Sequence, residues 1–425
     1  MDFIILLLYG LVNFTIIIKG LSSKQGYFYF PFWISVISLG WFYPQAIGGY
    51  FHIKEYPPYS YISALLFATI CNISLFFGWY LSVYKHSSKK SWLSNNIEEN
   101  RLYNVGAFFC LFGFYFQIKL WSLPEEMLDA NQWSGATVKY LFLGSVFKYG
   151  FIILWMQYLK NGKWLNIKYL IFIVPCALLL LNAAVLLGRR SEMMNITVYL
   201  IFGLWFAKGI VFPRKYLIVG LCLGLILINS IGLYRGVMKD RDLDLATKIS
   251  IVTNANYLEQ TNKIFEGSGV EFENYLFSRQ AYEDYGDYDF GAYHWNRVVL
   301  NYFPAQIFGN DLKNSLMIPT IDIIELISYR YGAYRPVGST ATGYLDSFGS
   351  FGWLGFIKFL IIGYMMGTLF KSAKNGYWLP QLLYLSFLTV AMVSITHNTN
   401  DILVRVWIYF FIIIYPMIRI INSRF

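Results

Sequence analysis

The segment YISALLFATICNISLFFGWYLSVY at residues 61–84 contains no Asp, Glu, Lys or Arg. About 20 consecutive apolar residues are enough to cross a bilayer as an α-helix, because the hydrocarbon core is about 30 Å thick. Similar segments occupy residues 169–188 and 217–234, and others recur along most of the 425 residues. The sequence therefore predicts an all-α, polytopic integral membrane protein.

The composition excludes a soluble globular domain. Hydrophobic residues make up 57% of the chain and charged residues 14%, whereas a soluble domain usually carries about a quarter charged residues. The four cysteines all lie in apolar stretches, so no disulfide framework is indicated. No two histidines are four residues apart, which leaves no zinc-binding helix pattern. We therefore expect neither a metal nor another cofactor.

Hydropathy predicts about eleven spans within a single membrane domain covering residues 1–425. Eight of them lie in residues 1–234 and three in residues 347–425, with a large loop at residues 235–346 between the two sets. The first span is expected to be retained, since Asp2 precedes its apolar run and no basic n-region is present. We place the spans near residues 2–18, 28–48, 61–84, 102–120, 139–159, 169–187, 192–211, 217–234, 349–370, 378–396 and 403–421.

The distribution of charge predicts the orientation. Most Lys and Arg residues of the short connections fall on one side of the predicted spans, which by the positive-inside rule is the cytoplasm. The C-terminus is then cytoplasmic and the large loop extracytoplasmic. That loop holds 15 acidic and 10 basic residues, so the chain's net charge of +10 reflects topology and no nucleic-acid partner is expected.

Two adjacent arginines stand out at an expected outer helix junction, in GRRSE at residues 188–192. Arg189 and Arg190 oppose the orientation rule, so a function is needed to offset their cost. The planar guanidinium binds phosphate with two parallel hydrogen bonds, and a lipid pyrophosphate lies at this interface. The alternative is that both snorkel to phospholipid headgroups, with Glu192 paired to one of them.

The large loop contains further arginines on the same predicted side. Arg235 directly follows the eighth predicted span and is the strongest single candidate among them. As a set with Arg189 and Arg190, these cations favour an anionic substrate, although each one alone is more simply a solvated charge. The others are Arg241, Arg279, Arg297, Arg330 and Arg335.

A polar cluster, HNTND at residues 397–401, precedes the last predicted span. Asp401 and Arg405 are four residues apart and can pair on one helical turn. His397, Asp401 or the loop carboxylate Asp346 is a candidate general base for a sugar hydroxyl. The alternative is a polar cap on a tight interhelical turn.

Acidic and aromatic residues alternate at residues 282–290, and Tyr293, His294 and Trp295 follow. Aromatic faces with carboxylates are typical of sugar sites, although a chain that is 20% aromatic contains such runs by chance. Residues 322–331 are predicted to form a short amphipathic helix with Ile323, Ile324 and Ile327 near one face.

At these residues the chain resembles the Wzy family, the O-antigen and capsular repeat-unit polymerases. The resemblance covers most of the chain from about residue 170 onward. It is carried by GRRSE at 188–192, YRG at 234–236, GYLDSFGSFGWLG at 343–355, and Asp401 with Arg405. It implies a fold similar to the metal-independent lipid-phosphate glycosyltransferases (GT-C-like) and a bacterial inner-membrane location.

The resemblance also implies partners and roles. The substrates would be undecaprenyl-pyrophosphate-linked oligosaccharides, with membrane lipids and a chain-length regulator protein as further partners. Catalytic roles would fall to Arg189, Arg190, Arg235, His397 and Asp401. Substrate-binding roles would fall to Tyr293, Trp295, Arg297, Arg330, Arg335, Asp346 and Arg405. The alternatives are an O-antigen ligase and a flippase without covalent chemistry.

Overall fold

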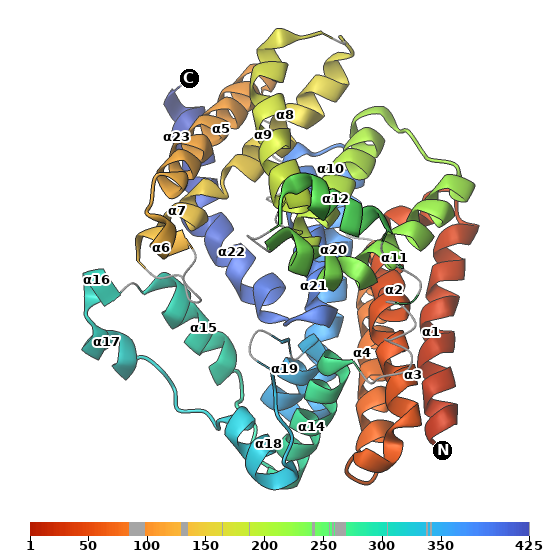
Figure 1. The fold of residues 1–425 in the computed structure, drawn as a ribbon. Helices are drawn as coiled ribbons and strands as arrows, with labels where there is room; N and C mark the ends of the chain where they lie inside the picture. Colours follow the sequence, from red (N-terminus) through yellow and green to blue (C-terminus); the bar gives the residue numbers. More distant parts are fainter. Residues whose placement is uncertain are drawn as a thin grey trace. The chain divides into compact units, whose positions relative to one another are not determined.

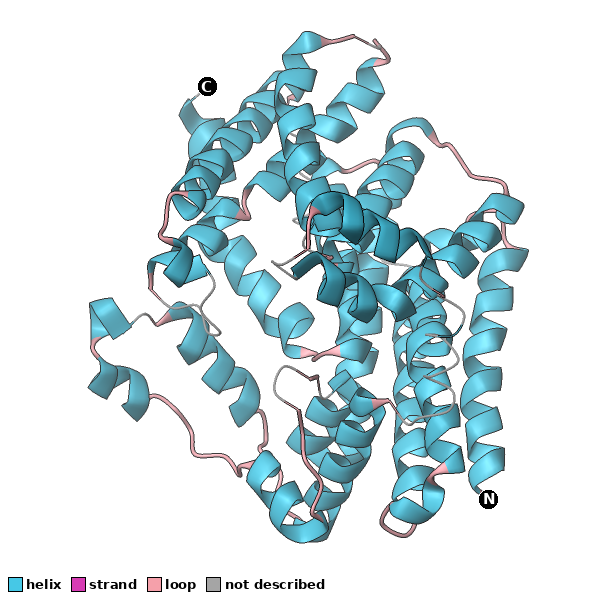
Figure 2. Ribbon diagram, viewed as in Figure 1, coloured by secondary structure: helices cyan, strands magenta, loops and turns pink. Residues whose placement is uncertain are grey.

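In the computed structural model the described residues are 1–84, 98–128, 135–163, 165–186, 188–239, 243–254, 256, 259, 269–303, 305–336, 339–340 and 342–424. Regular secondary structure in this part of the chain is helical and includes no strand, as Figure 2 shows. The predicted all-α class is therefore confirmed. Two compact units are formed: unit 1 contains residues 1–87, 212–368 and 390–407, and unit 2 contains residues 88–211, 369–389 and 408–425.

Seven helical segments in the described residues are long and apolar enough to cross a membrane, which supports a multi-pass membrane protein. The other four expected spans, near residues 28–48, 102–120, 192–211 and 217–234, are also helical but are not among the seven. The total of eleven spans therefore stays a prediction. The seven are Asp2–Ser22, Ser60–Tyr84, Ala136–Asn161, Ile167–Val185, Thr342–Lys374, Trp378–Thr396 and Asp401–Ile421.

The membrane part of unit 1 is built from the N-terminal helices and α19, with α1 packed beside α4 (Figure 1). Its interior holds a polar network. The Tyr344 hydroxyl donates to Asn72 Oδ1 (2.9 Å) and lies 3.2 Å from the Tyr9 hydroxyl, while Asn72 Nδ2 donates to Asn13 Oδ1 at 3.0 Å. Because buried polar groups are costly unless bonded, this network fixes the mutual register of α1, α4 and α19. The helices are α1 (Asp2–Ser22), η1 (Gly26–Phe28), α2 (Phe30–Ile37), η2 (Ser38–Phe42), α3 (Tyr43–Phe51), η3 (Ile53–Glu55), α4 (Ser60–Tyr84), α11 (Arg214–Lys239), α19 (Thr342–Phe351) and η6 (Gly352–Gly355).

The predicted large loop is itself largely helical where described. Its α14 packs against α4 and α19 and ends at Gly286, whose φ of +70° suits a residue without Cβ. The predicted helix at 322–331 is confirmed, with Asp322 accepting from Ile324 N at 3.0 Å as its N-cap. Ile327 is buried as expected, but Ile324 is exposed. The loop helices are α12 (Leu245–Asn254), α14 (Val270–Tyr285), α15 (Ala292–Tyr302), α16 (Ala305–Phe308), α17 (Asn310–Ser315) and α18 (Ile323–Tyr331).

Unit 2 is a helical bundle in which α8 packs against α5, α9 and α10. Glycines allow close helix approach there, since a Cβ at Gly150 would meet Cys110 and the backbone of Gly106 on α5. Helices α20 (Phe356–Lys374), α21 (Trp378–Thr396) and α22 (Val406–Tyr409) each contribute to both units, and η7 (Asp401–Arg405) belongs to unit 1. The helices of unit 2 are α5 (Glu99–Trp121), α6 (Glu125–Leu128), α7 (Ala136–Gly144), α8 (Phe147–Asn161), α9 (Ile167–Leu181), η5 (Asn182–Leu186), α10 (Arg190–Lys208), η8 (Phe410–Ile414) and α23 (Tyr415–Arg424).

Candidate functional site

A buried ion pair joins α19 to α20 in unit 1. Asp346, expected at the end of the loop, instead lies on α19 within the candidate span Thr342–Lys374. The Lys358 ammonium lies 3.7 Å from Asp346 Oδ1 and donates to the Asp346 carbonyl oxygen (3.0 Å) and to Ser350 Oγ (2.8 Å). The Asp346 side chain is 9% exposed and the Lys358 side chain is 6% exposed. An ionisable pair this deep in an apolar segment is a functional candidate by default.

The polar turn after α21 closes over the same carboxylate. The Thr399 backbone N–H donates to Asp346 Oδ2, and the Thr399 hydroxyl donates to Oδ1 at 2.7 Å. The start of α19 packs tightly here, since a Cβ at Gly343 would overlap the Ser394 carbonyl oxygen. With both carboxylate oxygens hydrogen-bonded to Thr399 and Lys358 beside them, Asp346 is held in place, which favours a positioning role over that of a mobile base.

His294 lies on α15, which contacts both α19 and η7. Its Nδ1 is 3.0 Å from the Asn400 side-chain oxygen, while its Nε2 is buried and has no hydrogen-bond partner among the described residues. With the Asn400 oxygen accepting, Nδ1 carries the proton and Nε2 presents a lone pair. Burial, with Lys358 adding, lowers the pKa of the imidazole from its ordinary 6.5, so the neutral form prevails at pH 7.

Cations and a tyrosine surround this end of unit 1. Arg297 is exposed and its guanidinium lies 5.4 Å from the centre of the Tyr293 ring. Burial, with Asp346 nearby, raises the pKa of the Tyr293 hydroxyl, which therefore stays protonated as a donor. The predicted pairing of Asp401 with Arg405 is confirmed at 3.1 Å, and the Tyr302 hydroxyl donates to the Arg405 carbonyl oxygen at 2.8 Å.

Several expected site residues have other partners. His397 is exposed, and its Nδ1 lies 2.7 Å from the Thr396 hydroxyl. Trp295 donates through Nε1 to the Leu316 carbonyl oxygen at 2.7 Å, which ties α15 to the segment after α17. Arg330 pairs with Asp284 at 3.2 Å. These contacts give His397, Trp295 and Arg330 structural roles, and their expected roles on a substrate stay predictions.

The remaining loop arginines differ in setting. Arg279 is fully buried, donates to Ser63 Oγ and Glu283, and stacks at 4.2 Å over the Phe348 ring. It therefore joins α14 to α4 and α19 as a structural residue. Arg335 donates to the Ser339 carbonyl oxygen at 3.2 Å. Arg241 lies outside the described residues.

Arg189 and Arg190 belong to unit 2, at the start of α10, and both are half-buried. The Glu192 carboxylate pairs with the Lys148 ammonium of α8 and accepts from Asn195 Nδ2 at 2.9 Å, and Arg189 also interacts with it electrostatically. Asn195 Oδ1 in turn accepts from the Thr389 hydroxyl at 2.6 Å. This network fixes the N-terminal turn of α10, on which the two arginines lie.

Arg235 belongs to unit 1 and lies inside α11, which continues beyond the predicted span to Lys239. The backbone of Arg235 is helical. Its expected role on the substrate stays a prediction.

Comparisons with protein-family models, with curated proteins and with solved structures found no match to this chain. The functional argument therefore depends on the chemistry of the residues themselves. Among the described residues no group of three or more His, Cys, Asp or Glu side chains is arranged to hold a metal ion. The unit 1 cluster offers a neutral imidazole, a fixed carboxylate–ammonium pair and two exposed arginines.

Sequence analysis missed His294 as a base and Lys358 altogether. Lys358 had a usable signal, because it is the only charged residue between Asp346 and Lys371 in an otherwise apolar stretch. His294 was noted only as part of an aromatic run. Its burial and its contact with Asn400, 106 residues away, have no signal in the local sequence.

Proposed function

We propose that the chain is a glycan polymerase. It transfers a growing glycan from undecaprenyl pyrophosphate to a new lipid-linked repeat unit, in the synthesis of O-antigen, capsule or a related surface polysaccharide. The protein lies in the bacterial inner membrane, with the His294 end of unit 1 facing the extracytoplasmic side. The observation that carries the proposal is the buried, unpartnered Nε2 of His294 beside the Asp346–Lys358 pair.

The reaction needs one proton acceptor and several cations. A hydroxyl oxygen of the incoming repeat unit attacks the anomeric carbon of the growing glycan, and the hydroxyl proton passes to His294 Nε2. The bond from that carbon to the pyrophosphate oxygen breaks, and undecaprenyl pyrophosphate leaves with the bonding electrons. Because the leaving group is already activated, neutralisation of its charge is the main electrostatic requirement.

Exposed cations near His294 in unit 1 are available for that task. Arg297 and Arg405 are exposed at the His294 end of unit 1. Arg189, Arg190 and Arg235 keep their predicted role as phosphate ligands. The Asp346–Lys358 pair and Thr399 hold α19, α20 and the polar turn in place, so that His294 and Asn400 keep their alignment.

The test compares two histidines in cells that depend on this protein for their surface glycan. Deletion should leave glycan of single repeat units on a gel, whereas loss of a ligase leaves none attached and loss of a flippase traps lipid-linked units inside. Complementation with His294→Asn should lower polymerisation about 10²–10⁴-fold, the usual contribution of a general base. His397→Asn, at the exposed histidine, should restore the ladder. The reverse pattern at matched protein levels would refute the assignment of the base.

A further inference from the structure

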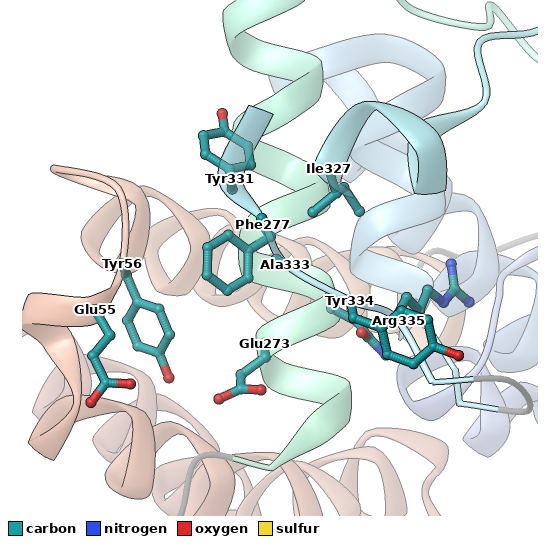
Figure 3. Close-up of a pocket in the computed structure, with 11 residues that line it drawn as sticks. Glu55, Tyr56, Glu273, Phe277, Ile327, Tyr331, Ala333, Tyr334 and Arg335 are labelled. Carbon is teal, nitrogen blue, oxygen red and sulfur yellow. The ribbon is translucent and has the colours of Figure 1, made fainter. Parts of the chain in front are cut away.

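A cavity of about 250 Å³ lies in unit 1 where η3, α14 and the end of α18 meet, shown in Figure 3. Its walls come from segments far apart in sequence: Glu55 and Tyr56, then Glu273 and Phe277 on α14, then residues 331–335 after α18. All of these segments lie outside the seven candidate membrane spans. The cavity therefore lies outside the candidate spans, and the exposed Tyr334 side chain lines it.

One wall of the cavity is aromatic. The Phe277 ring lies 5.7 Å from the Tyr56 ring at an interplanar angle of 78°, and 5.8 Å from the Tyr331 ring at 41°. These contacts fix the three rings in a row. Tyr334, also lining the cavity, is 75% exposed. Rings held in this way present apolar faces at little cost in conformational entropy on binding.

The polar groups of the cavity are mostly acceptors. Figure 3 shows the Glu55 and Glu273 carboxylates and the Tyr56 hydroxyl directed toward the same space. Asn274 is held beside them by bonds from its Nδ2 to Ser339 Oγ (2.9 Å) and the Thr340 carbonyl oxygen (3.2 Å). Charged acceptors next to rings suit a ligand with many hydroxyl donors and an apolar face, and two carboxylates against the one guanidinium of Arg335 disfavour an anion.

We propose that this cavity binds one uncharged sugar ring of the lipid-linked glycan, stacked on the aromatic wall with its hydroxyls donating to Glu55 and Glu273. The inference rests on the proposed function for the identity of the glycan. Arg335 lines the cavity and also interacts electrostatically with Tyr293, the neighbour of His294. Arg335 therefore links the cavity electrostatically to the α15 residue beside His294.

The test is direct binding to the full-length protein in lipid nanodiscs, followed by saturation-transfer NMR. The probes are the methyl glycosides of glucose, galactose, mannose and N-acetylglucosamine, with methyl glucuronide as the anionic comparison. Tyr334→Ala should weaken binding of the preferred glycoside about tenfold, the effect of losing one stacked ring. Glu273→Gln should weaken it about tenfold or more, because a charged acceptor is lost.

The controls lie on α18 and do not line the cavity. Tyr329→Ala removes a ring that is 91% exposed, and Glu325→Gln neutralises an exposed carboxylate, so both should leave binding unchanged. His294→Asn should also bind the glycoside normally while failing to polymerise. Absence of binding by every neutral glycoside, equal binding of methyl glucuronide, or equal loss in the Tyr329 control would overturn the sugar site. Glycoside binding that depends on Tyr334, in a protein whose deletion leaves glycan chain length unchanged, would support the cavity and refute the polymerase assignment.

Discussion

Replacing Lys358 with Met tests whether the Asp346–Lys358 pair holds the polar end of unit 1. The substitution keeps the length of the side chain but leaves a carboxylate that is 9% exposed without its counter-ion. Breaking a buried pair in this way costs about 3–5 kcal/mol in the free energy of unfolding. We expect the lower end, about 3 kcal/mol, because the two hydrogen bonds from Thr399 to Asp346 remain.

The assay is the free energy of unfolding in bicelles, measured by steric trapping. The double variant Lys358→Met/Asp346→Asn should recover about 1–3 kcal/mol relative to Lys358→Met, since the unpaired charge is gone. Lys374→Met, at an exposed lysine on the same helix, is the matched control and should change stability by less than about 0.5 kcal/mol. Equal costs for the two lysines, or no recovery in the double variant, would refute the buried-pair argument.

Three further predictions concern catalysis and packing. Because burial lowers the pKa of His294 from its ordinary value, polymerisation should fall with decreasing pH only below the range in which a free histidine titrates; an acid limb of the pH–rate profile centred above 6.5 would contradict this. Stability should change in the same direction, because the unfolded histidine binds its proton more readily and folding weakens as pH falls below 6.5. Gly343→Ala should greatly reduce the yield of monodisperse protein, because its methyl group meets a backbone carbonyl of α21, whereas Gly220→Ala has open space and should not. Arg189→Lys and Arg190→Lys should lower polymerisation about 10²–10³-fold at matched expression if each planar guanidinium binds pyrophosphate with two hydrogen bonds. Near-normal glycan ladders for both variants would indicate that the two arginines only anchor the helix in lipid headgroups.

The sequence was most informative where one local pattern decides the structure. An uncharged run of 24 residues such as 61–84 has few alternatives to a helix, and α4 covers it. The helix at 322–331 was equally predictable, because an Asp cap and a terminal glycine flank its apolar residues. The expected spans over residues 28–48, with Pro31 and Pro44 near its ends, and 192–211, with Glu192 and Lys208 near its ends, are helical but are not among the seven.

The candidate site could be predicted only in part, because its contacts join distant segments. Asp401 and Arg405 were predictable as a pair, since a helical turn alone brings them together. By contrast, Thr399 reaches Asp346 across 53 residues, and this contact changes the carboxylate from a candidate base into a positioning residue. Glu192 likewise pairs with Lys148, which lies 44 residues earlier in the chain.

Burial and partners, rather than the number of cations, decide which arginines remain for a phosphate. In the sequence the loop arginines form one set, of which Arg235 is the strongest candidate. In unit 1 the pairing of Arg279 with Glu283 and of Arg330 with Asp284 already compensates two of them. Arg297 has no carboxylate partner in the described part of the chain and lies one helical turn from His294 on α15. If the proposed polymerase reaction is correct, Arg297 is therefore the unit 1 arginine that we expect to neutralise the pyrophosphate leaving group.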